Sequence, residues 1–361
     1  MKFYDALQLD PAILKKKIKE CQTNKEKAFY WTAMALRAVL IVAFAIMFIG
    51  ALSNIFGSEN APMAVALFCI ILALRFVNFE YCVGDSLVTL AVVLGILLFI
   101  PSLISVLPSY LLFFAHFLAF FLILYITSQR PELGNGGLYG FAYVYVVGNP
   151  VHGEILLQRA ELTLVGYIIC AALLLLKHRH MHTEKRFHSI IINFSLSSLV
   201  NLWQLRLAAG VALVLTLGAV FGVKRFIWMG FACASLLSEY PYSEHIHVRF
   251  WQRIVGVIAG SGAFFILYQI MPEALLPLMA PAGGLCLGFC TDYRYKTAIN
   301  CFGALMAGTA IYGLHEAVLL RIFDTILGVV IGLIFAWAFH KLVTVKFLPK
   351  QKEEITAKST Q

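Results

Sequence analysis

Residues 31–50 read WTAMALRAVLIVAFAIMFIG, a run of twenty residues in which Arg37 carries the one charge. An α-helix needs about 20 mostly apolar residues to cross the hydrocarbon core of a bilayer. The apolar residues form a continuous run rather than alternating with polar ones, which excludes a strand of a membrane β-barrel. This stretch therefore predicts a membrane-spanning helix.

The rest of the chain has the same character. Of its 361 residues, 61% are hydrophobic and 13% are charged, and the mean hydropathy is +0.84. A soluble domain is about 45–50% apolar and about 25% charged, so lipid is the expected solvent. The first thirty residues are polar and rich in Lys, with no early apolar core. A cleavable signal peptide is therefore not expected.

The remaining apolar runs predict an all-α integral membrane fold with about twelve transmembrane helices. The runs 135–148 and 226–238 are short. They predict tilted, broken or re-entrant segments, which are tolerated only inside protein or beside a water-filled cavity. The predicted spans are 31–50, 61–77, 87–107, 109–127, 135–148, 160–177, 205–222, 226–238, 251–271, 274–290, 297–313 and 322–343.

The net charge of +9 is compatible with a nucleic-acid partner, but the positions of the charges argue against one. Basic residues gather before the first span, between the sixth and seventh spans, and after the last. Loops 51–60 and 101–109 contain no Lys or Arg. The positive-inside rule then predicts a multi-pass plasma-membrane protein with both termini and the central linker in the cytoplasm. Lys224 and Arg225 depart from this pattern, because they fall on the predicted outer side.

An internal duplication organises the chain. A tryptophan followed by a Leu-Arg pair begins both halves, at Trp31 and Trp203, and both halves end on a matching Arg, Thr and Gly. Six helices per copy return the chain to its starting side, so the sequence predicts two parallel repeats with a pathway at their interface. The predicted domains are a basic N-terminus (1–29), a first repeat (30–178), a linker (179–201), a second repeat (202–345) and a tail (346–361).

The N-terminal segment contains a helix start signal. Asp10 precedes Pro11, a typical N-cap followed by proline at the first helical position. Leu14 and Ile18 then share one face among several lysines. This pattern predicts a basic amphipathic helix on the inner leaflet, with a solvated tether as the alternative.

Glycines four residues apart occur in three helices of the second half. Such spacing lets helix backbones approach closely, and packing rather than chemistry is its expected role. The predicted packing glycines are Gly256, Gly260, Gly284, Gly288, Gly328 and Gly332.

Three arginines near span ends are candidates for substrate binding. Arg253 begins the ninth span, Arg321 begins the twelfth, and Arg159 is the counterpart of Arg321 in the first half. A guanidinium is always charged and can hold a carboxylate through two hydrogen bonds. The predicted topology places Arg253 near the inner mouth and the other two near the outer mouth. The alternative is that these side chains snorkel to headgroups or form local ion pairs.

Acidic residues near the spans are candidate proton carriers or ion-pair partners. Asp324 and Glu161 lie close to Arg321 and Arg159 in the sequence, and ionisable groups in spans often mark proton relays. Asp85 occupies the place in the first half that matches Arg253, so the two could pair across the interface of the repeats. The alternative is that Asp85 is an ordinary helix cap.

The sequence gives no sign of a metal site, a cofactor or an enzyme. The eight cysteines contain no CxxC pair and are expected to be free, mostly buried thiols. The histidines of segment 178–182 sit among positive charges, so we expect a solvated face there. No nucleotide-binding or hydrolase motif is present, so the chain is not expected to use ATP directly.

Several of these residues together resemble the fusaric acid resistance (FUSC) family. The resemblance runs over residues 30–343. It rests on Trp228, Glu239-Tyr240-Pro241, Arg253-Ile254-Val255-Gly256, the Arg321, Asp324-Thr325 and Gly328 pattern, Tyr139-Gly140-Phe141-Ala142-Tyr143-Val144 and Gly148-Asn149-Pro150-Val151.

The resemblance implies transport of small organic anions, because the family includes bacterial exporters of aromatic acids. The plant aluminium-activated malate transporters are related anion channels. One residue departs from the pattern: Val257 follows Gly256 where the family usually has threonine, so a hydroxyl is missing there. The large soluble domain of many relatives is also absent.

The sequence thus predicts an exporter of small organic, chiefly aromatic, carboxylates that is driven by a gradient, with protons as the candidate ion. Its expected partners are the lipid bilayer and the anion, and oligomerisation is left open. Two alternatives remain: a passive organic-anion channel, and a membrane scaffold or envelope assembly factor that transports nothing.

Overall fold

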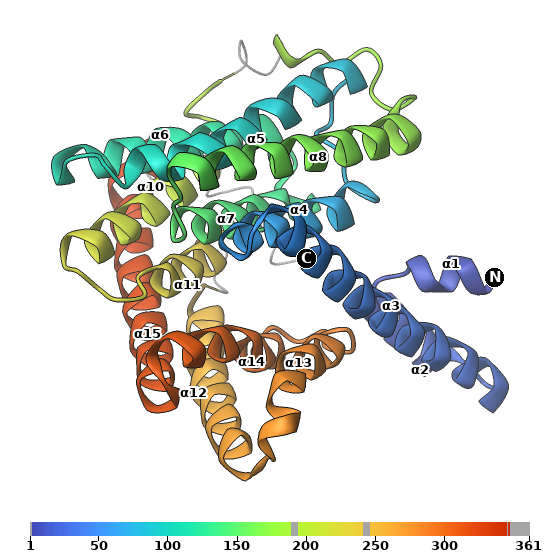
Figure 1. Ribbon diagram of the computed structural model, residues 1–361. Helices are drawn as coiled ribbons and strands as arrows, with labels where there is room; N and C mark the ends of the chain where they lie inside the picture. The colour runs from blue at the N-terminus through green and yellow to red at the C-terminus, as the bar shows by residue number, and fades with distance from the viewer. Residues whose placement is uncertain (1, 189–193, 241–245, 345, 347–361) are drawn as a thin grey trace. The chain divides into compact units, whose positions relative to one another are not determined.

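The computed structural model describes residues 2–188, 194–240, 246–344 and 346. These residues form helices joined by turns, and no strand occurs among them (Figure 1). Seven of the helices are long and apolar enough to cross a membrane. The all-α membrane class predicted from the sequence is therefore confirmed.

Every predicted span contains a helix. The count of about twelve crossings stays a prediction, because several of these helices are too short or too polar to join the seven. The helices are α1 (Phe3–Gln8), α2 (Pro11–Glu20), α3 (Asn24–Phe56), α4 (Ala61–Leu74), α5 (Val83–Ile104), α6 (Ser109–Thr127), α7 (Asn135–Val147), α8 (Gly153–His178), α10 (Leu199–Val220), α11 (Ile227–Leu237), α12 (Ile246–Ile270), α13 (Met279–Leu287), α14 (Tyr293–Tyr312) and α15 (Leu314–Phe339).

The two short runs form short helices, as their lengths predict. Helix α7 has 13 residues and α11 has 11. At about 1.5 Å per residue, neither covers a hydrocarbon core of about 30 Å. Most side chains of both helices are buried in protein. The backbone groups at their ends are therefore not exposed to lipid.

Several helices, α12 and α15 among them, begin earlier than the hydropathy predicts. Helix α12 starts at Ile246 rather than 251, and α15 starts at Leu314 rather than 322. Apolar runs mark the part of a helix that prefers lipid, whereas backbone hydrogen bonding continues through the polar residues before it. As a result, Arg253 and Arg321 lie about two turns inside their helices rather than at the ends.

The N-terminal start signal is confirmed. The Asp10 side chain accepts a hydrogen bond from the N–H of Ala12 at 2.8 Å, and Pro11 is the first residue of α2. Leu14 on this helix is fully buried. The location on the inner leaflet stays a prediction, and the predicted tail lies almost wholly outside the described residues.

The contacts divide the described chain into two compact units. The first unit comprises the described residues within 1–50 and 247–326, and the second those within 51–246 and 327–361. Both units combine segments of the two predicted repeats. The predicted domain boundaries stay a prediction.

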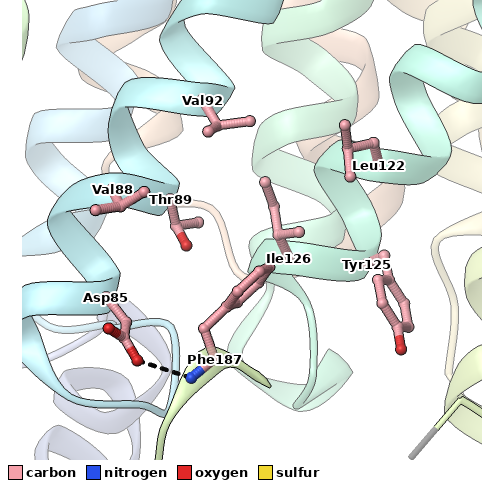
Figure 2. A pocket seen from close by; sticks show the side chains of 8 residues that line it. All are labelled: Asp85, Val88, Thr89, Val92, Leu122, Tyr125, Ile126 and Phe187. Atoms are coloured by element: carbon pink, nitrogen blue, oxygen red, sulfur yellow. Dashed lines mark hydrogen bonds between the residues drawn. The ribbon is translucent and has the colours of Figure 1, made fainter. Parts of the chain in front are cut away.

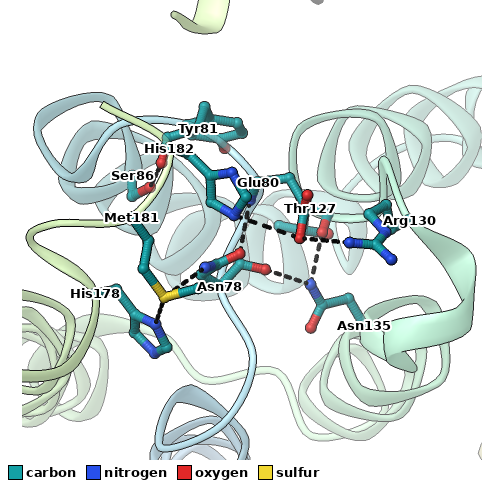
Figure 3. A network of polar contacts seen from close by, with 10 residues as sticks. All are labelled: Asn78, Glu80, Tyr81, Ser86, Thr127, Arg130, Asn135, His178, Met181 and His182. Carbon is teal, nitrogen blue, oxygen red and sulfur yellow. Dashed lines mark hydrogen bonds and ion pairs between the residues drawn. The ribbon is translucent and has the colours of Figure 1, made fainter. Parts of the chain in front are cut away.

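In the second unit, one polar network joins the loops that follow α4, α6 and α8 (Figure 3). The Asn135 amide donates to Thr127 O at 2.8 Å and to Asn78 O at 3.3 Å. Glu80 meets Arg130 at 3.3 Å and His182 at 3.6 Å. The sequence predicts all three loops on one side of the membrane, and these contacts agree.

A separate set of hydrogen bonds joins the loops at the opposite ends of these helices. The Ser102 hydroxyl donates to Val151 O at 2.7 Å. The Asn60 amide donates to Ile155 O at 3.3 Å. Two distinct sets of loops are what helices running alternately up and down require.

Glycines bring two pairs of helices in the second unit into close contact. A Cβ added at Gly166 of α8 would lie 2.5 Å from both methyl groups of Leu67 on α4. A Cβ added at Gly328 of α15 would lie 2.7 Å from the Met229 Cα on α11. In each predicted half, the last helix thus packs against the second.

Candidate anion-binding site

Three charged side chains from α12 and α15 gather in the first unit. Arg253 is 8% exposed, Arg321 is 4% exposed and Asp324 is fully buried. Arg253 and Asp324 both act electrostatically on Arg321, which also contacts the Cys301 thiol of α14. We call Arg253, Arg321 and Asp324 the charged cluster. This proximity differs from the predicted separation of the two arginines between opposite mouths.

Small residues on α12 allow α14 to approach this cluster. A Cβ at Gly256 would lie 2.8 Å from Arg294 O, and one at Gly260 would overlap the backbone of Ala298. The Cys301 Sγ lies 4.0 Å from Val257 O as a result of this approach. The glycines therefore hold α14 against the helix that carries Arg253.

Several polar atoms in and beside the charged cluster lack hydrogen-bond partners among the described residues. They are Arg253 Nε, both carboxylate oxygens of Asp324 and Thr325 Oγ1, and all of them are buried. An unpaired buried polar group costs about 1–3 kcal/mol, and native structures contain few of them. A bound anion, proton or water would satisfy these atoms.

Arg159 has a different environment, although the sequence makes it the counterpart of Arg321. Its Nε donates to Asn60 Oδ1, its Nη1 to Asn149 O and its Nη2 to Glu59 O, each at 2.9 Å. All three nitrogens are thus engaged with protein, and the side chain is fully buried. This favours a structural role, and its predicted substrate binding stays a prediction.

The two other acidic candidates, Glu161 and Asp85, belong to the second unit. Glu161 is exposed on α8. Asp85 lies in the first turn of α5, where a helix dipole favours a carboxylate. Its Oδ2 accepts the N–H of Phe187 at 2.8 Å, and Arg186 lies 3.6 Å away. Asp85 therefore holds the linker, and its pairing with Arg253 stays a prediction.

Sequence reasoning missed the role of Arg206, which served only as a marker of the predicted duplication. Its Nη2 donates to Leu237 O at 3.1 Å and to Glu239 O at 2.9 Å, at the carboxyl end of α11. Arg206 is 4% exposed. The available signal was a single arginine inside an apolar run.

The cysteines are free thiols, and His178 contacts the end of α4. All eight cysteines are free; Cys286 is exposed, contrary to the expected burial, and Cys290 is half-buried. His178 Nε2 lies 2.8 Å from Leu74 O. Among the described residues, no three His, Cys, Asp or Glu side chains are placed to hold a metal ion.

Together these features define an all-helical, multi-spanning membrane protein with a buried charged cluster. Residues 210–335 match the family model described as fusaric acid resistance protein-like. The matched segment contains the entire charged cluster. No curated protein and no solved structure matched the chain. The similarity to plant malate transporters stays a prediction.

Proposed function

We propose that this protein exports small organic anions and that the charged cluster is its anion site. The carrying observation is the buried Arg253 guanidinium, whose Nε has no hydrogen-bond partner among the described residues. A guanidinium in this state can form charge-assisted, bidentate hydrogen bonds with a carboxylate. Arg159 has no such unpaired nitrogen, because all three of its nitrogens donate to protein acceptors.

The composition of the cluster supports a monocarboxylate as the substrate. When Asp324 is ionised, the two arginines and this aspartate leave a single positive charge for the substrate to neutralise. Charge balance matters strongly in a buried site, where an unpaired charge is costly.

Aromatic side chains near the cluster support an aromatic substrate. Cys301, which contacts Arg321, also belongs to an apolar cluster with Val257, Phe264 and the partly buried Phe302. The rings of Phe264 and Phe302 meet edge to face at 5.7 Å. Such rings favour similar contacts with an aromatic ligand. Val257 is fully buried there, so it contributes packing where relatives have a hydroxyl.

Asp324 is the candidate for coupling transport to protons. Neither of its buried carboxylate oxygens has a hydrogen-bond partner among the described residues, and such a carboxylate gains from binding a proton. The membrane potential also favours outward movement of an anion, by about 2.3 kcal/mol per charge at 100 mV. The two driving forces can be separated by experiment.

We expect proteoliposomes containing the protein to take up benzoate saturably, faster when a pH gradient is imposed at zero membrane potential. Asp324→Asn should remove the response to pH but keep uptake driven by a potential. Uptake that is driven by a potential and ignores pH in the unmodified protein would indicate a passive channel. Absence of uptake under both conditions would favour a scaffold and contradict the proposal.

The proposed transporter has two parallel repeats of six spans. The contact of Gly166 with Leu67 and that of Gly328 with Met229 support the duplication. Each residue of the second contact follows its counterpart in the first by the same number of positions. Parallel repeats would form a pathway where they meet.

Cysteine labelling tests the proposed topology. In a cysteine-free background, Thr183→Cys should react only after the membrane is permeabilised, because the linker is predicted inside. Ser58→Cys should react with an impermeant maleimide in intact cells. Labelling of residue 183 from outside would contradict the six-plus-six arrangement.

A further inference from the structure

A pocket of about 470 Å³ lies between α5 and α6 in the second unit (Figure 2). Its volume is within the range of small-molecule sites, about 300–1,000 Å³. The linker closes one end with Phe187, beside Asp85. The lining residues are Asp85, Val88, Thr89, Val92, Leu122, Tyr125, Ile126 and Phe187.

Polar groups at the pocket already have partners. Asp85 accepts the N–H of Phe187 at 2.8 Å. The Tyr81 hydroxyl lies 2.6 Å from both Thr89 Oγ1 and Ile126 O, and burial raises the pKa of Tyr81, so this hydroxyl stays neutral. The part of a ligand that enters the pocket should therefore be apolar.

The open side of the pocket consists of exposed apolar side chains on two predicted spans. Val88 is 64% exposed, Val92 41% and Leu122 42%. On helices that cross a bilayer, such side chains face hydrocarbon rather than water. A lipid chain can enter the pocket directly from the membrane.

The end of the pocket at Asp85 is flanked by exposed basic side chains. Arg186 lies 3.6 Å from Asp85, and its side chain is 63% exposed. Lys185 is also exposed, and its carbonyl accepts the N–H of Cys82 at 2.8 Å, which fixes the linker at the start of α5. Glu184 is an exposed acidic neighbour. Basic residues just outside a span attract anionic headgroups.

We propose that this pocket binds one acyl chain of an anionic phospholipid whose headgroup phosphate contacts Arg186 and Lys185. An aromatic carboxylate fits less well, because its charge would lie inside the pocket, where the polar groups named above are occupied, whereas a phosphate headgroup stays outside at the basic residues. The proposal requires only that the protein lies in a membrane. It does not rest on the charged cluster or on the transport proposal.

Native mass spectrometry of the full-length protein in detergent tests the proposal, with added phosphatidylglycerol or phosphatidylcholine as probe. We expect phosphatidylglycerol to bind more tightly. Arg186→Gln should weaken its binding about fivefold, the worth of one basic residue near a headgroup, and leave phosphatidylcholine unchanged. Val92→Phe should weaken binding of both lipids about tenfold, because the ring displaces methylene groups of the chain.

Leu164→Phe is the matched control, because Leu164 is 60% exposed on α8 and does not line the pocket. It should bind both lipids as the unmodified protein does. If Val92→Phe lowers the unfolding temperature, Val88→Phe is a second variant that fills the same pocket. Equal binding of the two lipids by the unmodified protein would overturn the headgroup contact. Unchanged binding in a folded Val88→Phe or Val92→Phe variant would overturn the pocket.

Discussion

Arg253→Gln and Arg321→Gln should each weaken the apparent substrate affinity by about 1.5–3 kcal/mol, the usual contribution of a hydrogen bond to a charged group. Expression of both variants should remain normal. Both guanidinium groups are buried. When one of them is removed, water cannot take its place as a hydrogen-bond donor to the substrate carboxylate. The measurement is the concentration dependence of benzoate uptake in proteoliposomes.

Lysine at these positions separates binding from snorkelling. Lysine keeps the charge but loses the planar fork, so Arg253→Lys and Arg321→Lys should restore uptake only partly. A snorkelling side chain would be replaced equally well by lysine.

Arg249→Gln is the control on the same helix. Arg249 lies 4.9 Å from the Tyr293 ring and does not belong to the charged cluster. The Arg249→Gln variant should transport normally. If Arg253→Gln and Arg321→Gln also transport normally, the charged cluster is not the anion site.

Gly260→Ala should destabilise the protein strongly, whereas Gly262→Ala on the same helix should not. A Cβ at Gly260 would overlap the backbone of Ala298 on α14, which cannot rotate away as a side chain could. Forcing atoms into a packed contact typically costs about 1–3 kcal/mol. At Gly262 there is no atom within 4 Å of the added Cβ, so alanine should gain up to about 1 kcal/mol of helix propensity.

Thermal unfolding of the purified variants in detergent measures both effects. A lower transition temperature for Gly260→Ala, with an equal or higher one for Gly262→Ala, is the expected pair of results. If both variants unfold alike, the close contact of α12 with α14 does not form.

Hydropathy predicted which segments are helical, because an apolar run that crosses a bilayer must satisfy its backbone hydrogen bonds internally. It predicted the starts of α12 and α15 poorly. The residues before each apolar run are polar but still helical, so the runs mark membrane preference rather than helix ends. For that reason the sequence placed Arg253 and Arg321 at the ends of their spans rather than inside the helices.

The sequence also marked the arginines as candidates, but it did not predict which residues surround them. Arg159 and Arg321 occupy matching places in the predicted duplication, yet Arg159 is held by protein acceptors, whereas Arg321 contacts a thiol and feels the charge of an aspartate. Those neighbours come from distant segments, such as Asn60, Asn149 and Cys301. Spacing along one helix carries no information about them.

The three hydrogen bonds of Arg159 have a consequence for genetic surveys of this protein. Asn60 Oδ1, Asn149 O and Glu59 O surround one planar group, and no other side chain offers donors in that geometry. Every substitution there should therefore lower the amount of folded protein in the membrane. A screen that scores only resistance or growth would rank Arg159 beside Arg253 and Arg321. Counting molecules of the protein per cell would separate a residue needed for folding from residues needed for the proposed transport.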